Sequence, residues 1–174
     1  MRVLDAIKAR RSVRRFEPRG VEEWKLREVL EAARLAPSAD NRQPWRMVVV
    51  EDPVVKQELL RAHGKPWLAE APLVLVACAL PWEAWRRRDG EEYWKVDVAI
   101  ALEHVALAAV ELGLATCWVA SFDEEAVKEV LGIPSAVRVV ALMALGYPAE
   151  HKGPVADRKA LNELVCLNRW RWPS

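Results

Sequence analysis

Apolar residues in the first third of the chain recur mostly at helical spacing, and prolines or charged clusters separate the segments. Residues 3–9 place Val3, Ala6 and Ile7 on one face, which predicts a short helix that ends at an arginine-rich stretch. Residues 21–36 predict a second helix, because Glu22 and Glu23 suit its N-terminal dipole and a proline follows its last residue. A third helix is predicted over residues 54–63.

Four runs of β-branched and other apolar residues predict strands at 47–50, 73–80, 115–120 and 137–145. The run at 73–80 has no polar interruption, which is typical of a strand covered on both faces. Between the last two strands we expect a helix that begins at Ser121 or Asp123 and ends at Leu131. A short helix is expected at 160–165, and a lid or insertion on the surface at 81–92.

Residues 94–112 form the longest apolar segment, and their apolar positions cover almost the whole circumference of a helix. Such a helix must be buried on all sides. In a chain of 174 residues we expect a second copy of the protein to cover one side, since most soluble oligomers are symmetric homo-oligomers. His104 lies in this segment, and we interpret it as a buried, hydrogen-bonded histidine rather than a ligand or base.

Residues 10–14 gather three guanidinium groups and a hydroxyl, Arg10, Arg11, Ser12 and Arg14, directly after the first predicted helix. Guanidinium presents a planar fork of donors that matches phosphate oxygens, so the stretch is a candidate anion clamp. The alternative is that these cations complement the dipole at the end of the helix and are otherwise solvated.

Residues 37–45 form a loop between two prolines that contains small and amide-bearing side chains. An amide offers a donor and an acceptor together, which suits recognition of a heterocyclic ring edge. The alternative, which the loop alone favours, is a simple helix-to-strand turn in which Asn41 bonds to its own backbone.

Composition excludes several classes of protein. A hydrophobic content of 52% in 174 residues fits a single domain over residues 1–174, and a net charge of +1 argues against a nucleic-acid-binding surface. No signal-like opening is present, and no uncharged apolar run approaches the ~20 residues that a membrane span needs. The three cysteines show no CxxC spacing, which fits a reducing cytoplasm. Each of the nine tryptophans is interpreted first as a core residue.

No phosphate-binding glycine loop, nucleophile elbow or metal-binding motif occurs, and the three histidines are widely separated in the sequence. Metal hydrolysis and serine-type acyl transfer therefore find no support, and we predict no metal site. If the protein is an enzyme, we expect its reactive chemistry to come from a bound organic cofactor.

Several motifs together resemble the FMN-dependent nitroreductase family, which includes oxygen-insensitive nitroreductases and flavin reductases. The matching segments lie in family order over nearly the whole chain: residues 10–14, 37–45, 97–99, 117–122, 146–148 and 158–159. The resemblance implies an α+β fold with a mostly antiparallel sheet and a homodimer built on the long central helices. It also implies two FMN molecules at the dimer interface, each contacted by both subunits.

The family pattern also implies a set of cofactor-binding residues. Arg10, Arg11, Ser12, Arg14 and Arg158 would hold the phosphate and flank the ring. Pro37, Ser38, Ala39 and Asn41 would line the flavin from the other subunit. Trp118, Ala120 and Ser121 would lie against the isoalloxazine, with a backbone N–H directed at N5. Many members have Gly or Glu-Gly at Ala120-Ser121, and larger members have a longer excursion at 81–93.

The function implied is hydride transfer from NADH or NADPH to a nitroaromatic, a quinone or another small flat aromatic acceptor, by a ping-pong mechanism. A cation near N1 and C2=O, such as Arg10 or Arg14, would stabilise the reduced flavin, and no catalytic side chain is expected. Two alternatives remain: another flavin reaction, namely reductive dehalogenation or flavin modification, and a flavin-binding dimeric scaffold without turnover.

Overall fold

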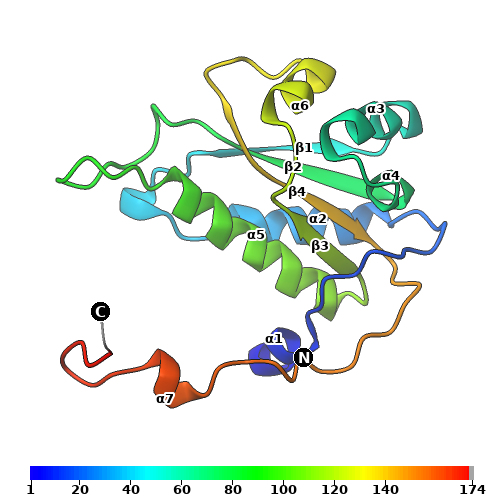
Figure 1. Ribbon diagram of the computed structural model, residues 1–174. Helices are drawn as coiled ribbons and strands as arrows, with labels where there is room; N and C mark the ends of the chain where they lie inside the picture. Colours follow the sequence, from blue (N-terminus) through cyan, green and yellow to red (C-terminus); the bar gives the residue numbers. More distant parts are fainter. Residues whose placement is uncertain (173–174) are drawn as a thin grey trace.

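The computed structural model describes residues 1–172, which fold around one four-stranded antiparallel sheet (Figure 1). The strands are β1 (Trp45–Val50), β2 (Leu73–Ala79), β3 (Ala115–Val119) and β4 (Arg138–Gly146), in the order β1-β2-β4-β3. All four strands were expected from the apolar runs, and the largest shift of an end is two residues at the start of β1. The antiparallel α+β fold that the resemblance implies is confirmed.

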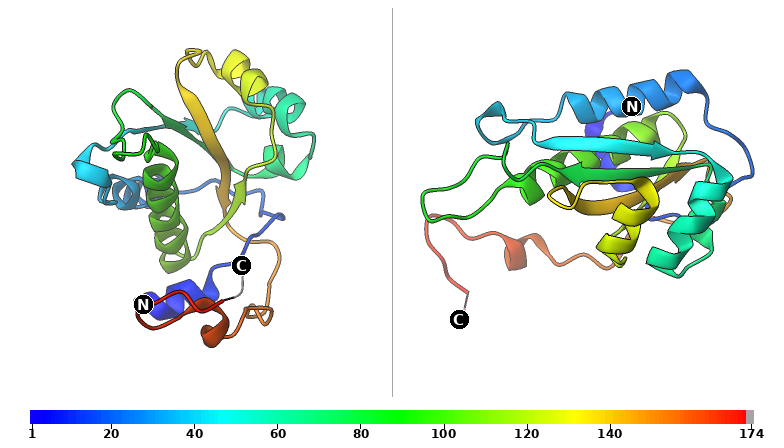
Figure 2. Two further views of the ribbon diagram at one scale, coloured as in Figure 1. Left: turned by 60° about the vertical axis from the view of Figure 1, so that its left-hand side comes forward. Right: turned by 90° about the horizontal axis from the view of Figure 1, so that it is seen from above.

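Helices cover both faces of the sheet, as the view from above in Figure 2 shows. One face packs against α2 (Glu23–Arg34) and α5 (Trp94–Glu111). The other packs against α3 (Pro53–His63), α4 (Trp67–Glu70) and α6 (Glu124–Leu131). Val74 and Val76 of β2 point to the second of these layers, while Leu75 points to the first. The prediction that this strand is covered on both faces is therefore confirmed.

Capping residues in the sequence set the ends of two of these helices. The Asp52 carboxylate accepts hydrogen bonds from the first turn of α3, with Pro53 at its first position, and Gly64 ends the helix at φ 75°. Asp123, one of the two expected caps, accepts from Ala126 N at the start of α6. The short helix α4 was not predicted, because its four residues carry no detectable periodicity.

One side of α5 packs on the sheet and on α2, and the opposite side lies open in the single chain. Val98, Leu102 and Val105 are fully buried, whereas Val96 is 47% exposed and Glu103 is exposed. His104 is half-buried, and its Nδ1 lies 3.3 Å from the carbonyl oxygen of Ala32, as expected for a hydrogen-bonded histidine. Within residues 1–172, no helix combines the length and the apolar character needed to cross a membrane.

The interpretation of every tryptophan as a core residue is wrong. Trp94 is buried, but Trp24, Trp82, Trp118 and Trp170 are exposed by 37% or more. The two layers between helices and sheet are filled by valine, leucine and alanine, which pack closely on the narrow sheet. The large indoles lie instead on outer helix faces, in loops and at a strand edge.

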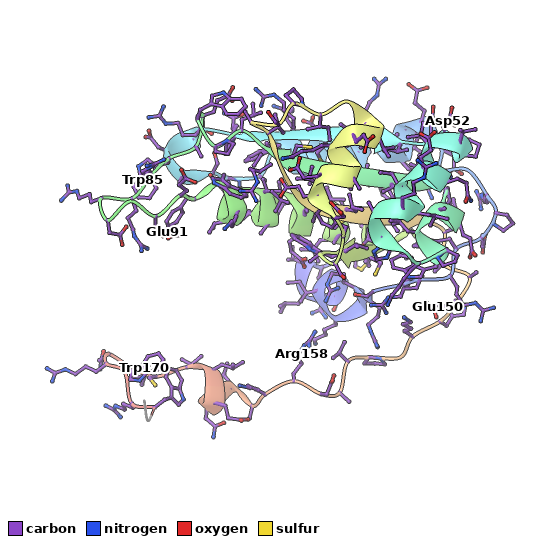
Figure 3. All side chains as sticks on the ribbon, turned by 45° about the horizontal axis from the view of Figure 1, so that its top comes forward. Asp52, Trp85, Glu91, Glu150, Arg158 and Trp170 are labelled. Atoms are coloured by element: carbon purple, nitrogen blue, oxygen red, sulfur yellow. The ribbon has the colours of Figure 1, made fainter. Side chains whose placement is uncertain are left out.

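The N-terminal segment lies beside β3, and the C-terminal segment leaves the body of the molecule. After α1 (Val3–Ala9) the chain is extended, and Ser12 forms a parallel bridge with Thr116 of β3. Beyond β4, residues 153–172 form an arm that leads away from the body and contains α7 (Leu161–Leu164) (Figure 3). The apolar arm residues Leu161, Leu164, Leu167 and Trp170 are more than half exposed. Residues 81–93 form an exposed excursion closed by an Arg86–Glu92 bridge.

The free energy of unfolding is expected to fall between about pH 4.5 and pH 2, in part because of Glu124. Arg138 donates two hydrogen bonds to this carboxylate, at 2.9 and 3.0 Å, and lowers its pKa from 4.5 to about 2. Because the folded pKa lies below the unfolded one, the stabilisation is complete above pH 4.5 and disappears as the pH falls through 2.

Glu124→Gln should therefore be less stable than the wild type by about 2 kcal/mol at pH 6, after allowance for solvent screening. The two proteins should converge near pH 2, which urea unfolding at a series of pH values measures. Glu125→Gln is the control, since the Glu125 side chain is 79% exposed. A Glu124→Gln deficit that stays constant from pH 6 to pH 2 would contradict this assignment.

Candidate functional site

The arginine-rich stretch follows α1 rather than belonging to it. The helix ends at Ala9, its last turn contains Lys8 as its only cation, and Arg11 and Arg14 lie on extended chain beside β3. A role limited to the helix dipole is therefore ruled out for Arg11 and Arg14, because the dipole effect falls off within the last turn. The candidate anion clamp lies along the free edge of β3.

Few carboxylates neutralise these arginines. Arg10 Nε lies 3.6 Å from Glu103 Oε1, whereas Arg11, Arg14 and Arg158 form no ion pair within residues 1–172. Arginines elsewhere, such as Arg34, Arg87 and Arg138, are paired at 3.0 Å or less. Three arginines without an ion pair thus occur among the residues for which the resemblance predicts a phosphate contact, although Arg61, Arg88, Arg169 and Arg171 elsewhere in residues 1–172 also form none.

A groove of about 710 Å³ separates α1 and α5 from the beginning of the arm. It brings Arg10 and Arg158 together although they are far apart in the sequence. Figure 3 shows Arg158 on the arm where the arm passes α1. The charged lining consists of these two arginines and Lys8 against two carboxylates, Asp5 and Glu103, and the rest is apolar. This lining, with one more cation than carboxylates, suits a ligand with an anionic group on an organic chain.

Arg14 is directed away from this groove, toward α4. Its guanidinium carbon lies 5.8 Å from the centre of the Trp67 ring, and its backbone N–H donates to Glu150 Oε1 at 2.7 Å. Ser12 is fixed by its bridge to Thr116 and by Lys152 Nζ, which donates to its carbonyl oxygen at 2.6 Å. The backbone of the clamp is thus held by β3 and by residues 150–152.

The end of β3 continues this edge. Trp118 is 37% exposed between the buried Cys117 and Val119, and the next two residues, Ala120 and Ser121, are exposed. The carbonyl oxygen of Ser121 lies 2.7 Å from His63 Nδ1. The backbone N–H groups of Ser121 and Phe122 have no acceptor within residues 1–172. They remain free to donate to a ligand on this edge.

The loop at 37–45 has an unusual backbone. Asp40, Asn41 and Gln43 all have φ near +50°, a region that non-glycine residues rarely occupy and that is often found at functional sites. Ser38 Oγ accepts from Gln43 N at 2.9 Å, and Gln43 Nε2 donates to Asn41 O at 3.0 Å. The Asn41 side chain forms no hydrogen bond within residues 1–172, so the simple turn capped by Asn41 is not what the structure shows.

A buried carboxylate holds this loop. Ala39 N donates to Asp97 Oδ1 at 2.9 Å, while Asp97 Oδ2 is buried without a partner in the described chain. Burial raises the pKa of Asp97 above its usual value. The exposed Pro37 and Asn41 and the half-buried Ser38 and Ala39 thus lie at the N-terminal end of α5.

The structure brings the predicted site residues together in two groups rather than one. Arg10 to Arg14 and Trp118 to Ser121 share the β3 edge, with Arg158 opposite Arg10. The Pro37–Asn41 loop is fixed at Asp97, whereas Arg11 lies beside Val110, thirteen residues later in the same helix. At 1.5 Å per residue, Asp97 and Val110 are about 20 Å apart along α5.

Three residues near these groups escaped the sequence analysis as site residues. Asp97 belongs to the matching segment 97–99 but received no role there, although a carboxylate in a segment that is apolar on nearly all sides is a signal for one. His63 and Trp67 gave no such signal, since their nearness to Ser121 and Arg14 arises from the packing of α3 and α4 against the β3 edge.

Comparison with known proteins gives the following matches. The family model described as "Nitroreductase family" matches residues 7–65 and 54–147. A Thermus thermophilus protein named NADH dehydrogenase is 39% identical, with 97% of each chain covered. A nitroreductase family protein from Clostridium difficile 630 superposes with a TM-score of 0.91 at 31% identity, over 98% of this chain and 100% of that one. An FMN-dependent nitroreductase from Clostridium difficile R20291 gives 0.84 at 30% identity, over 96% and 99%.

Proposed function

The chain belongs to the nitroreductase family, and from this premise we propose that it is an FMN-dependent oxidoreductase that transfers hydride from NADH or NADPH to a flat aromatic acceptor. Nitroaromatics and quinones are the acceptor classes we have in mind. The observation that carries the proposal is the gathering of four arginines, of which only Arg10 is ion-paired, near a strand edge with free N–H groups. The relatives named NADH dehydrogenase and FMN-dependent nitroreductase support the choice of hydride donor and cofactor.

The residues present fit FMN. Its phosphate requires cations, which Arg10, ion-paired with Glu103, and Arg158, which forms no ion pair within residues 1–172, offer across a 710 Å³ groove. Its ring requires a flat, partly apolar wall with backbone donors, which the exposed Trp118 and the unpaired N–H groups after it provide. We assign Arg11, Ser12 and Arg14 to the wall of the site that contains Trp118. We assign Ala120 and Ser121 to the part of that wall that contacts the flavin ring.

When bound, FMN supplies the hydride chemistry, and the protein positions it and stabilises charge. Arg14, whose guanidinium has no carboxylate partner, would stabilise negative charge on the pyrimidine side of the ring. The free N–H groups after β3 would fix the orientation of the ring edge. No acid or base is required of the protein at the transfer step. One open site then serves donor and acceptor in turn, which gives ping-pong kinetics.

We further propose that the enzyme is a homodimer in which each FMN is lined by both subunits. The open face of α5 and the exposed apolar arm both lack a covering partner in the single chain. Along α5 the Pro37–Asn41 loop is fixed at Asp97, whereas Arg10 contacts Glu103 and Arg11 lies beside Val110, further toward the C-terminal end. A second copy in the reverse direction would complete both sites. We expect this dimer to work in the cytoplasm, where its free cysteines stay reduced.

The proposed activity is tested by mixing the FMN-loaded protein with NADH, and separately with NADPH, in the absence of oxygen. We expect rapid loss of the flavin absorbance, and its return on addition of menadione or nitrofurazone. FMN at about 100 times its dissociation constant should add about 2.7 kcal/mol to the free energy of unfolding.

Two results would count against the proposal. A protein that neither retains nor takes up FMN would remove its basis. A protein that binds FMN but shows no reduction by either nucleotide would indicate a flavin-binding scaffold. Reduction followed by transfer only to a halogenated phenol would favour the dehalogenase alternative.

A further inference from the structure

We propose that His63 is a positioning residue of the flavin site: through a hydrogen bond to Ser121 it fixes the backbone whose N–H groups face the cofactor. The inference rests on the proposed function, because it concerns the same site. His63 itself need not touch FMN. The segment 120–122 carries the unpaired donors at the end of β3, and α3 supplies the residue that holds it.

The geometry around His63 determines which ring nitrogen carries the hydrogen. Nδ1 lies 2.7 Å from the carbonyl oxygen of Ser121, which is only an acceptor, so Nδ1 must be the donor. Nε2 is buried and has no partner within residues 1–172. The ring also packs edge-on against Trp67, with ring centres 5.4 Å apart. The imidazole is therefore held in one orientation and one tautomer.

Two consecutive residues of α3 hold the segment after β3 at two points. Ala62 O accepts from Asp123 N at 2.8 Å, and His63 Nδ1 donates to Ser121 O. Phe122 lies between the two attachment points. Its peptide with Ser121 is trans, so the carbonyl that points toward His63 and the N–H of Phe122 point in opposite directions. The hydrogen bond thus directs this free N–H away from α3.

Helix α3, which carries His63, is fixed at both ends and by the core. His63 occupies the last turn of α3, whose first turn is capped by Asp52 and whose end is set by Gly64. Leu59 and Ala62 of the same helix are buried in the core. Without the Nδ1 donor, the Ser121 carbonyl would lose its partner and the peptide plane would be free to turn. The free N–H groups would then no longer be aimed at one position.

The N–H groups after β3 are expected to be directed at N5, which accepts a hydrogen bond in the oxidised flavin and carries a hydrogen itself in the reduced flavin. A donor aimed there holds the oxidised flavin more than the reduced one. Loss of the His63 contact should therefore weaken binding of the oxidised cofactor about tenfold relative to the reduced one. For a two-electron couple this raises the midpoint potential of bound FMN by about 30 mV. The value of kcat should fall with little change in KM for NADH, because the proposed role of His63 is to hold Ser121 and not to bind the nucleotide.

The test compares two substitutions in the FMN-loaded protein. His63→Asn keeps a side-chain N–H close to the position of Nδ1, whereas His63→Gln carries its amide near the position of Nε2. We expect His63→Asn to keep the potential and kcat of the wild type, and His63→Gln to show the higher potential and about tenfold lower kcat. Gln57→Asn is the control, since Gln57 is exposed on the same helix and its side chain forms no hydrogen bond within the described residues.

Equal potentials and equal kcat values for His63→Asn and His63→Gln would overturn the inference, even if both variants melt at a lower temperature. A second measurement does not depend on the folding of any variant. Nitrogen-15 NMR of histidine-labelled wild type should show the His63 ring protonated at Nδ1 and not at Nε2. The opposite tautomer would also overturn the inference. Failure of the proposed function would appear separately, as a wild type that binds no FMN.

Discussion

Two variants that each fail to bind FMN are expected to bind it when they are combined in one dimer. The first parent carries Arg10→Glu and Arg14→Glu, which reverse the charge of the proposed phosphate and ring contacts. The second carries Ser38→Trp, which places a large ring in the loop at the other end of α5. Each parent homodimer has the same defect in both sites, so we expect FMN binding to be lost.

In the heterodimer, one site combines both defects and the other combines the intact arginines of one chain with the intact loop of its partner. We therefore expect about one FMN per heterodimer, measured by absorbance after isolation with two different affinity tags. Parent homodimers carrying the same tags are the controls, and light scattering confirms that each is a dimer. A heterodimer that binds no FMN would show that the loop serves the arginines of its own chain.

Deletion of the arm is expected to have the second largest effect, on assembly. Removal of residues 160–174 deletes several exposed apolar side chains and keeps Arg158. Burial of a leucine or valine side chain contributes about 1.5–3 kcal/mol, and the arm contributes several to the proposed interface. We expect the dissociation constant of the dimer to rise by at least ~100-fold, about 2.7 kcal/mol.

Sedimentation velocity over a range of concentrations measures this change. Circular dichroism should show that the sheet and its helices remain, because residues 156–165 are exposed and do not contribute to either core layer. Trp82→Ser is the matched control, since it removes an indole that is 60% exposed on the body instead of the arm. An unchanged dissociation constant after the deletion would show that the arm lies outside the interface.

The strands and main helices could be predicted because each depends on local patterns. The run at 73–80, the cap at Asp123 and the helical spacing of residues 21–36 act within a few residues of the element they define. The tryptophans could not be placed in this way. Whether Trp82 or Trp94 is buried depends on which other segment packs over it, and no local sequence pattern identifies that segment.

The candidate site, too, could be predicted from the sequence only in part. The arginines and the amide loop stood out because their residue types cluster in the sequence, although assigning them to one cofactor required the resemblance to a family. Their separation along α5, and the attachments to Asp97 and His63, are tertiary contacts between residues 58 positions apart in each case. Such contacts become visible only once the helices are packed on the sheet.

The distance between the two groups along α5 has a thermodynamic meaning. Neither chain of the proposed dimer holds a complete binding site, so the equilibrium for FMN binding and the equilibrium for subunit association are coupled. Any factor by which FMN tightens the dimer is, by linkage, the factor by which dimerisation tightens FMN. On dilution, FMN release and subunit dissociation should then occur together. The fraction of flavin sites that are occupied would therefore depend on the concentration of the protein.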